Sequence, residues 1–247
     1  MITSVKNESI KAMRALLTRK GRRESGFHLI EGERLVFDAL SSGVKAGSVF
    51  VSENRPDLGR RLSEAGIAFE TVSDNVMTSL SDTESPQGLI ASVKTPDTSA
   101  PAVFPSGLIV ALDRVQDPGN LGTVIRTADA FGAAGLILSE GCADPWSPKA
   151  VRSAMGSVYH IPVWQGELSN ELNRLKEQGF FIVCGHLKGK EALPELPEKR
   201  VLIIGNEANG ASDEASESAY LYRLPMKGRA ESLNAAAAAA VLIYLMS

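Results

Sequence analysis

The chain has 247 residues, of which 44% are hydrophobic, and a formal net charge of −3, which suits one large folded domain or two of ordinary size. Its longest apolar stretch, Ala235 to Met246, is only about half as long as a membrane-spanning helix, so we expect no membrane span. Its two cysteines, Cys142 and Cys184, lie far apart and belong to no paired metal or redox motif, which argues against a disulfide and a bound metal.

The first 25 residues are basic. They hold seven Lys or Arg and two Glu, a charge of +5 that leaves −8 for the remainder of the chain. They also lack the apolar core of a secretory signal, so we expect a cytoplasmic protein. A basic segment on an acidic protein favours contact with the phosphates of a nucleic acid. A solvated helix face would have the same composition, and both interpretations remain open at this stage.

Helix and strand patterns alternate over the first part of the chain. Helical patterns cover 4–19, 34–41, 57–65 and 75–81, and strand-like segments cover 27–31, 48–52, 69–72 and 89–93. The next segment, Lys94 to Pro105, holds three prolines among Thr, Ala and Ser, which is typical of a linker. We therefore predict a small α/β domain over residues 1–97 and a second domain over 106–247.

The second domain begins with the continuous apolar run 107–112, which ends at Asp113 and is typical of a strand buried on both faces of a parallel sheet. Further strands are predicted at 136–138, 180–184 and 201–204, and helices at 121–131, 168–177 and 213–217. This alternation predicts an open α/β domain. Ligands of such domains bind at the carboxyl ends of the strands.

Two polar residues follow the first of these strands. Asn120 lies near the start of the predicted helix, where an asparagine is commonly the N-cap. Arg126 lies on the same helix among apolar and small residues, either as a surface cation or as a group that engages a phosphate or ribose. Gly119 and Gly122 do not match the spacing of a dinucleotide-binding loop.

Two more loops follow strands later in the chain. The first, VLIIGNEANGAS at 201–212, contains Gly205 and Glu207, and its serine, Ser212, is a candidate N-cap. The second, LPMKGRAESLN at 224–234, leads into an alanine-rich helix, with Ser232 and Asn234 as candidate caps. If all these strands belong to one open sheet, the loops gather at a single edge, which favours one ligand site there.

Three segments resemble the SpoU branch of the SPOUT methyltransferases: DPGNLGTVIRTADAFGA, IIGNEANG and LPMKGRAESLNAAAAA, in that order. The resemblance continues through RSAMGSVYHIPV at 152–163, and FHLIEGERLVFDAL at 27–40 looks like the substrate-binding domain of such enzymes. It implies a C-terminal α/β domain with a deep trefoil knot that binds S-adenosyl-L-methionine, a smaller L30e-like domain in front of it, and an obligate homodimer with composite active sites.

The resemblance also assigns site residues by position. Gly205, Leu224 and Leu233 are implied to contact the cofactor largely through backbone atoms, and Met226 is implied to belong to the wall of the cofactor pocket. Those implied to form the catalytic neighbourhood are Arg126, Asn120, Glu207, Ser232 and Asn234. The chain departs from the family pattern at Ala208, where glycine is common, and at Ala235, where valine is common, which leaves the loop shape open.

The implied reaction transfers a methyl group to a ribose 2′-hydroxyl of RNA, with ribosomal RNA favoured over transfer RNA, and needs no metal. The family is usually described with the arginine, here Arg126, as the base. A guanidinium is normally a permanent cation, so stabilisation of the developing alkoxide is the easier role. A transfer RNA enzyme, a base-nitrogen methyltransferase and a catalytically silent RNA-binding protein remain as alternatives.

Overall fold

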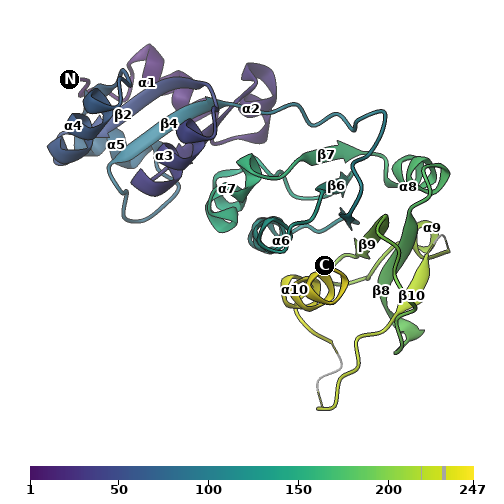
Figure 1. Cartoon of the computed structure of the whole chain (residues 1–247). Helices are drawn as coiled ribbons and strands as arrows, with labels where there is room; N and C mark the ends of the chain where they lie inside the picture. Colours follow the sequence, from purple (N-terminus) through teal and green to yellow (C-terminus); the bar gives the residue numbers. More distant parts are fainter. Residues whose placement is uncertain (218, 230–231) are drawn as a thin grey trace. The chain divides into compact units, whose positions relative to one another are not determined.

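The computed structural model describes residues 1–217, 219–229 and 232–247 (Figure 1). These residues form two compact units. Unit one contains Met1–Pro96 and Asp144–Tyr159, and unit two contains Asp97–Ala143 and His160–Ser247. The predicted division of the chain between residues 97 and 106 stays a prediction. In the structure, residues 144–159 also pack with the first unit.

Unit one is built on a four-stranded sheet with the order β1-β4-β2-β3, in which only the β2–β3 pair is parallel. Its strands are β1 (Phe27–Glu31), β2 (Ala46–Ser52), β3 (Glu70–Val72) and β4 (Leu89–Lys94). Its helices are α1 (Glu8–Ala15), α2 (Arg19–Ser25), α3 (Glu33–Ser41), α4 (Pro56–Glu64), α5 (Asp74–Leu80) and α7 (Pro148–Ala154), followed by the 3-10 turn η1 (Ser157–Tyr159). The predicted alternation of helices and strands is confirmed.

The basic N-terminal segment forms two helices where the sequence predicts one. Thr18 separates them, because its side chain accepts a hydrogen bond from the backbone N–H of Gly21 and so caps α2. One face of α1 is apolar, and Ile10 and Met13 on that face are buried in a cluster with Phe50 of the sheet. The first helix is therefore part of the hydrophobic core of unit one.

Unit two is built on a six-stranded parallel sheet with the order β10-β8-β9-β5-β6-β7. Its strands are β5 (Leu108–Leu112), β6 (Gly135–Ser139), β7 (Val163–Gly166), β8 (Phe181–Lys190), β9 (Arg200–Ile204) and β10 (Tyr220–Tyr222). Its helices are α6 (Pro118–Ala130), α8 (Leu168–Glu177), α9 (Asp213–Glu217) and α10 (Ala235–Met246). The predicted α/β class and open parallel sheet are confirmed.

Helices cover both faces of this sheet. Ile109 and Ala111 of the central strand β5 are fully buried in one cluster with Leu172 and Leu175 of α8. On the other face, α6 and α10 pack side by side (Figure 1). Every residue of β5 is buried, as the uninterrupted apolar run 108–112 predicts.

No helix in the described part of the chain is long and apolar enough to cross a membrane. The trefoil knot that the family resemblance implies stays a prediction.

Candidate functional site

The three loops singled out in the sequence follow β5, β9 and β10, which are strands of one parallel sheet. The carboxyl ends of parallel strands lie at the same edge of the sheet, so the loops after β5 and β9 begin beside each other. The segment after β10 leads into α10, which packs on α6. Residues from all three motifs can therefore meet at this edge.

Asn120 is not the N-cap of α6, so the expectation that its side chain caps this helix is wrong. Asp117 caps the helix, because its carboxylate accepts a hydrogen bond of 2.8 Å from the backbone N–H of Asn120. Pro118 at the first helical position fits this helix start. The side-chain amide of Asn120 is thereby left free for other partners.

Both polar atoms of that amide are used by the other two motifs. Its Nδ2 donates to Oε1 of Glu207 at 3.0 Å, and its Oδ1 accepts from Nδ2 of Asn234 at 3.2 Å. Asn234 also caps α10, because its Oδ1 accepts from the backbone N–H of Ala236 at 2.9 Å. A continuous chain of hydrogen bonds, Glu207–Asn120–Asn234, thus joins the three motifs.

The carboxylate of Glu207 is held in its charged form. Burial by itself would raise the pKa of Glu207, but the hydrogen bond from Asn120 and backbone N–H groups outweigh it, and the pKa lies below its usual value. One of these donors is the backbone N–H of Gln116, 3.4 Å from Oε2. The site therefore presents a negative charge on a side chain that is itself exposed.

The turn after β9 has its shape fixed by backbone packing. A side chain at Gly205 would place its Cβ 2.0 Å from the backbone nitrogen of Ala211, so only glycine fits there. Asn206 closes the turn, because its Nδ2 donates to the carbonyl of Arg114 at 2.7 Å and its Oδ1 accepts from the N–H of Ala208 at 2.9 Å. Ala208 has no positive φ, so an alanine is accommodated where the family commonly has glycine.

Sequence reasoning did not identify Asp113 as a residue of this edge. Its side chain is buried, with Oδ2 accepting from the backbone N–H of Ser212 at 2.7 Å and Oδ1 from Nε of Arg114 at 3.1 Å. It thereby ties the end of β5 to the loop after β9. An aspartate directly after a fully buried strand is the signal that could have revealed it.

The candidate cofactor residues present apolar surface. Leu224 and Met226 are half-buried in the segment after β10, and Leu233, just before α10, is 42% exposed. Ser232 is exposed, and Asn234 rather than Ser232 caps α10. Partly exposed apolar side chains of this kind offer surface to a flat apolar ring such as the adenine of S-adenosyl-L-methionine.

Arg126 does not join the Glu207–Asn120–Asn234 chain. It follows Asn120 by six positions on α6, a rotation of about 120° around the helix, and its side chain is exposed. Among the residues that the structure describes, none forms a hydrogen bond or ion pair with its guanidinium. Arg126 thus leaves a free positive charge on the surface of α6.

No group of three or more His, Cys, Asp or Glu side chains suited to a metal ion occurs among the described residues.

Comparison with known proteins covers both units. Residues 107–244 match the SpoU rRNA Methylase family, and residues 7–91 match the MRM3-like substrate binding domain. The chain is 37% identical to the 23S rRNA (guanosine(2553)-2'-O)-methyltransferase of Bacillus subtilis, over 98% of this chain and 97% of the relative. It is 31% identical to the 23S rRNA (uridine(2479)-2'-O)-methyltransferase of Streptomyces viridochromogenes, over 98% of this chain and 90% of the relative.

Solved structures give the same result. The AdoMet-bound rRNA methyltransferase of Sinorhizobium meliloti has a TM-score of 0.86 to this chain at 34% identity, over 98% of this chain and 95% of that one. The similarity therefore extends over both units, and the three motifs that suggested the family lie together at one edge of the sheet. The chain belongs to the SpoU rRNA methylase family.

Proposed function

We propose that this chain transfers the methyl group of S-adenosyl-L-methionine to a ribose 2′-hydroxyl of ribosomal RNA. The observation that carries the proposal is the hydrogen-bonded chain Glu207–Asn120–Asn234, which unites all three family motifs at the ligand-binding edge of the sheet. The full-length similarity to two 23S rRNA 2'-O-methyltransferases supports ribose as the acceptor and ribosomal RNA as the substrate. A cytoplasmic location is part of the proposal, since the relatives similar over nearly the whole chain include bacterial enzymes that act on 23S rRNA.

The cofactor residues of the proposal are Gly205, Leu224, Met226 and Leu233. S-adenosyl-L-methionine supplies an electrophilic methyl group on a sulfonium. The absence of a side chain at Gly205 keeps this turn tight, and the apolar side chains of the segment before α10 offer surface to the adenine. The carboxylate of Glu207, held ionised by its hydrogen bonds, favours a cationic ligand nearby.

The role of Arg126 in the proposal is electrostatic. Methyl transfer needs the attacking oxygen in line with the methyl carbon and its leaving sulfur, and it develops negative charge on the ribose oxygen. A guanidinium stabilises that charge without giving up a proton, which a group of such high pKa does not readily do. Asn120 then acts as a positioning residue that holds Glu207 and Asn234 in register.

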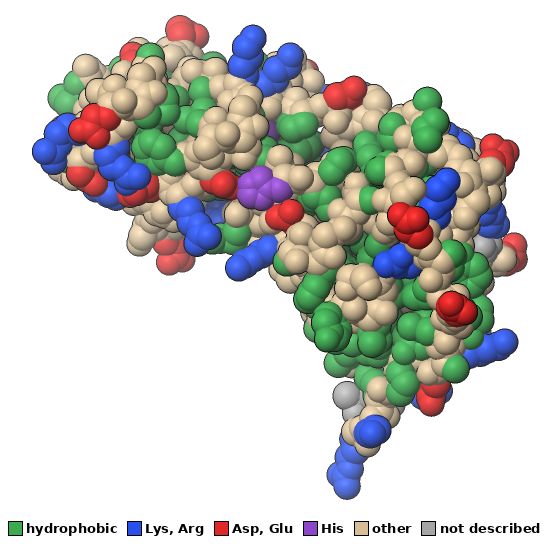
Figure 2. All heavy atoms as spheres, viewed as in Figure 1, with side chains coloured by type: hydrophobic (Ala, Val, Ile, Leu, Met, Phe, Trp, Pro, Cys, Tyr) green, Lys and Arg blue, Asp and Glu red, His purple; other side chains and the backbone are tan. Residues whose placement is uncertain are grey.

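We further propose that the enzyme is a homodimer in which Arg126 serves the site of the partner. Within one chain Arg126 has no described partner and lies off the Glu207–Asn120–Asn234 chain. Large hydrophobic side chains are exposed close by, at the end of α6 and along α10: Phe131, Val241, Tyr244 and Leu245. Figure 2 shows hydrophobic side chains gathered where α10 lies. A second copy of the chain that covers this surface would bury its apolar area. It would also bring the guanidinium of its Arg126 to the Glu207–Asn120–Asn234 site of the first copy.

The test is transfer of tritiated methyl from S-adenosyl-L-methionine to RNA that lacks its own modifications, followed by nuclease digestion and nucleoside chromatography. We expect label in a 2′-O-methylnucleoside of ribosomal RNA. Label confined to transfer RNA would reject the proposed substrate, and label in a base would reject the acceptor. Cofactor binding without transfer to any RNA would favour a catalytically silent RNA-binding protein.

A further inference from the structure

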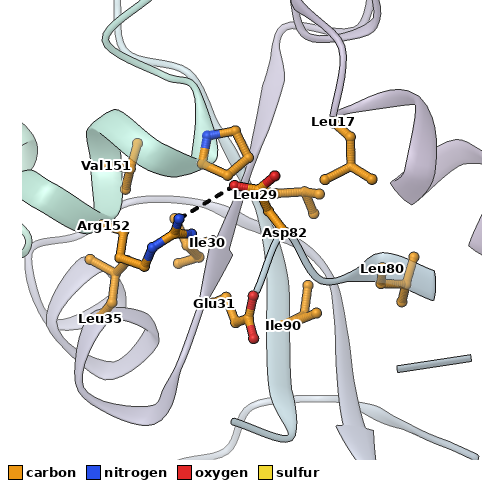
Figure 3. Close-up of a pocket in the computed structure, with 11 residues that line it drawn as sticks. Leu17, Leu29, Ile30, Glu31, Leu35, Leu80, Asp82, Ile90, Val151 and Arg152 are labelled. Atoms are coloured by element: carbon orange, nitrogen blue, oxygen red, sulfur yellow. Dashed lines mark hydrogen bonds and ion pairs between the residues drawn. The ribbon is translucent and has the colours of Figure 1, made fainter. Parts of the chain in front are cut away.

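Unit one contains an apolar crevice beside its sheet. Figure 3 shows its lining, with Leu29 and Ile30 from β1 and Val151 from α7. Arg152 reaches across it and pairs with Asp82 at 3.4 Å. The volume of the crevice is about 10 Å³, which accommodates at most one water molecule. The crevice is therefore a packing defect between α7 and the sheet and holds no larger ligand.

A larger groove adjoins this crevice and shares Glu31, Leu35 and Arg152 with it. Its volume is about 110 Å³, and its other lining residues are Gly32, Arg34, Gln87 and Met155. The groove thus lies between the turn from β1 to α3 and the end of α7. Its lining residues come from two parts of the chain. Those between 31 and 87 lie in the range that matches the substrate binding domain, and Arg152 and Met155 lie in the range that matches the methylase family.

Two arginines and one glutamate line the groove, and one of the arginines has no acidic partner among the described residues. Arg34 is exposed, and no described residue forms an ion pair with it, whereas Arg152 has Asp82 as its partner. Glu31 is the one acid in the lining. Its carboxylate accepts hydrogen bonds from two hydroxyls of the loop 81–87 and from the backbone N–H of Gln87. An anionic group such as a phosphate would find Arg34 unneutralised.

The same groove offers an apolar wall and an amide edge. Met155 is 44% exposed and has a φ of 52°, a left-handed conformation that a side chain rarely adopts. Leu35 is half-buried beside it in the lining. The amide of Gln87 lies over Gly32, where a Cβ would come within 2.5 Å of Oε1. An apolar wall, an amide with donor and acceptor, and a cation together match a base, its polar edge and its phosphate.

Both walls of the groove are fixed within unit one. The segment that carries α7 is held by a buried ion pair in which Nη2 of Arg22 contacts Oδ2 of Asp144 at 2.6 Å. Nε2 of the fully buried His28 lies 2.7 Å from the hydroxyl of Tyr159. Because residues on both sides of α7 are anchored in this way, the groove is preorganised, which lowers the entropic cost of binding.

We propose that this groove binds one unstacked nucleotide of the RNA substrate, with its phosphate on Arg34, its base against Leu35 and Met155, and its edge on Gln87. The inference rests on the proposed function for the identity of the RNA. It assigns part of the recognition of RNA to α7, a helix within the range that matches the methylase family. Single-stranded segments of RNA present their bases for contacts of this kind.

Binding of in vitro transcribed 23S rRNA, measured by filter binding without cofactor over a range of salt concentrations, tests the proposal. We expect Arg34→Gln to raise Kd about tenfold and to lower the slope of log Kd against log salt by about 0.7, the value for one single-stranded phosphate. Met155→Ala should raise Kd similarly and leave the slope unchanged. The matched control is Arg60→Gln, an exposed arginine of α4 outside the groove, which should change neither quantity.

An Arg34→Gln variant that binds RNA as the Arg60→Gln control does would overturn the proposal. So would ultraviolet cross-linking that places the RNA on no peptide containing residues 31–35, 87 or 152–155. In methyl transfer, the groove variants should raise KM for RNA and leave kcat and cofactor affinity unchanged. A wild-type protein that binds RNA through the groove but transfers no methyl would contradict the proposed function alone.

Discussion

At the scale of single residues, Asn120 carries the connection between the three motifs. It uses one amide atom for Glu207 and the other for Asn234, so a replacement must supply both a donor and an acceptor at these two positions. A carboxylate has no N–H to donate, and an alanine has neither group. The chemistry of the site therefore depends on this amide being correctly oriented.

We predict that Asn120→Asp raises the pKa of Glu207, because it replaces a hydrogen-bond donor with a second carboxylate. In the wild type the pKa of Glu207 is lowered, so the contribution of its hydrogen bonds to stability is present above the usual pKa of glutamate and is lost as the pH falls through the folded value. The variant should lose activity at mildly acidic pH where the wild type keeps it. The measurement is kcat/KM as a function of pH; coinciding acidic limbs would contradict the prediction.

We predict that Arg126→Ala lowers kcat about 100-fold or more, the usual effect of removing one donor that stabilises an oxyanion, and leaves cofactor affinity intact. Its side chain is exposed and forms no hydrogen bond or ion pair with a described residue of its own chain, so the fold should be unaffected. Parallel calorimetry with S-adenosyl-L-methionine and methyl-transfer assays decide this. If the Arg126→Ala variant kept its activity, the proposed catalytic role of Arg126 would be wrong.

The family resemblance grouped Asn120, Glu207 and Asn234 with Arg126 and Ser232 in one site, and hydrogen bonds among the described residues join the first three. Asn120, Glu207 and Asn234 were singled out because each follows a strand of the same sheet. The segment D-P-G-N offers two candidate caps, Asp117 and Asn120, and only the start of the helix decides between them. The roles of Ser232 and of the four cofactor residues stay predictions.

At the scale of elements, the basic N-terminal segment also contributes to the hydrophobic core, which neither interpretation of its composition predicted. Ile10 and Met13 are buried in the core, and Arg22 is 7% exposed in its ion pair with Asp144. The remaining Lys and Arg of the segment include exposed side chains, such as Lys11 and Arg14. Deletion of the segment would therefore remove core packing together with charge, and substitutions are the cleaner experiment.

We predict that the triple change Lys11→Gln, Arg14→Gln, Lys20→Gln weakens RNA binding and flattens its salt dependence, since each lost phosphate contact removes one counterion-release step. Circular dichroism should show an unchanged fold, because all three side chains are exposed. Arg22→Gln is the contrasting variant. It leaves the buried Asp144 carboxylate without its guanidinium and should cost about 3–5 kcal/mol in urea unfolding. An unchanged salt slope in the triple variant would contradict phosphate contact and favour the interpretation of these charges as a solvated helix face.

Most elements with a clear apolar pattern were predictable, whatever their length. The helices at 168–177 and 213–217 have the predicted bounds, and the buried strand at 108–112 differs from its prediction by one residue. The elements missed are α2, α7, η1, β7 and β10. β7 and β10 have four and three residues, too few for a period to appear. For α7 the signal was present, since Ser147 caps the helix and Pro148 occupies its first turn.

At the scale of the whole molecule, the return of residues 144–159 to unit one could not be read from composition. The proline-rich segment 94–105 marks where the chain leaves the first unit, and nothing comparable marks the return. Tertiary contacts hold this segment in unit one. One of them is the Arg22–Asp144 ion pair, which joins residues 122 positions apart. Contacts of that range are set by three-dimensional packing and leave no local pattern.

The proposed composite site makes a prediction that only an assembly of two chains can satisfy. Arg126→Ala and Glu207→Gln should each be inactive alone. If Arg126 serves the partner's site, a heterodimer of the two variants has one site with both lesions and one with neither. Equal mixing under conditions that exchange subunits should then restore about a quarter of the wild-type rate, because about half of the dimers are mixed and each has one intact site.

The control for that experiment blocks assembly. Tyr244 is 64% exposed on α10, and a charge in its place should keep the chain monomeric without disturbing the core. Tyr244→Lys in both variants should therefore abolish the recovery, with sedimentation confirming the monomer. If Arg126 instead acted within its own chain, every heterodimer would contain two defective sites, and mixing would restore nothing. Recovery in the mixture and its loss in the Tyr244→Lys background thus separate a composite site from a site completed within one chain.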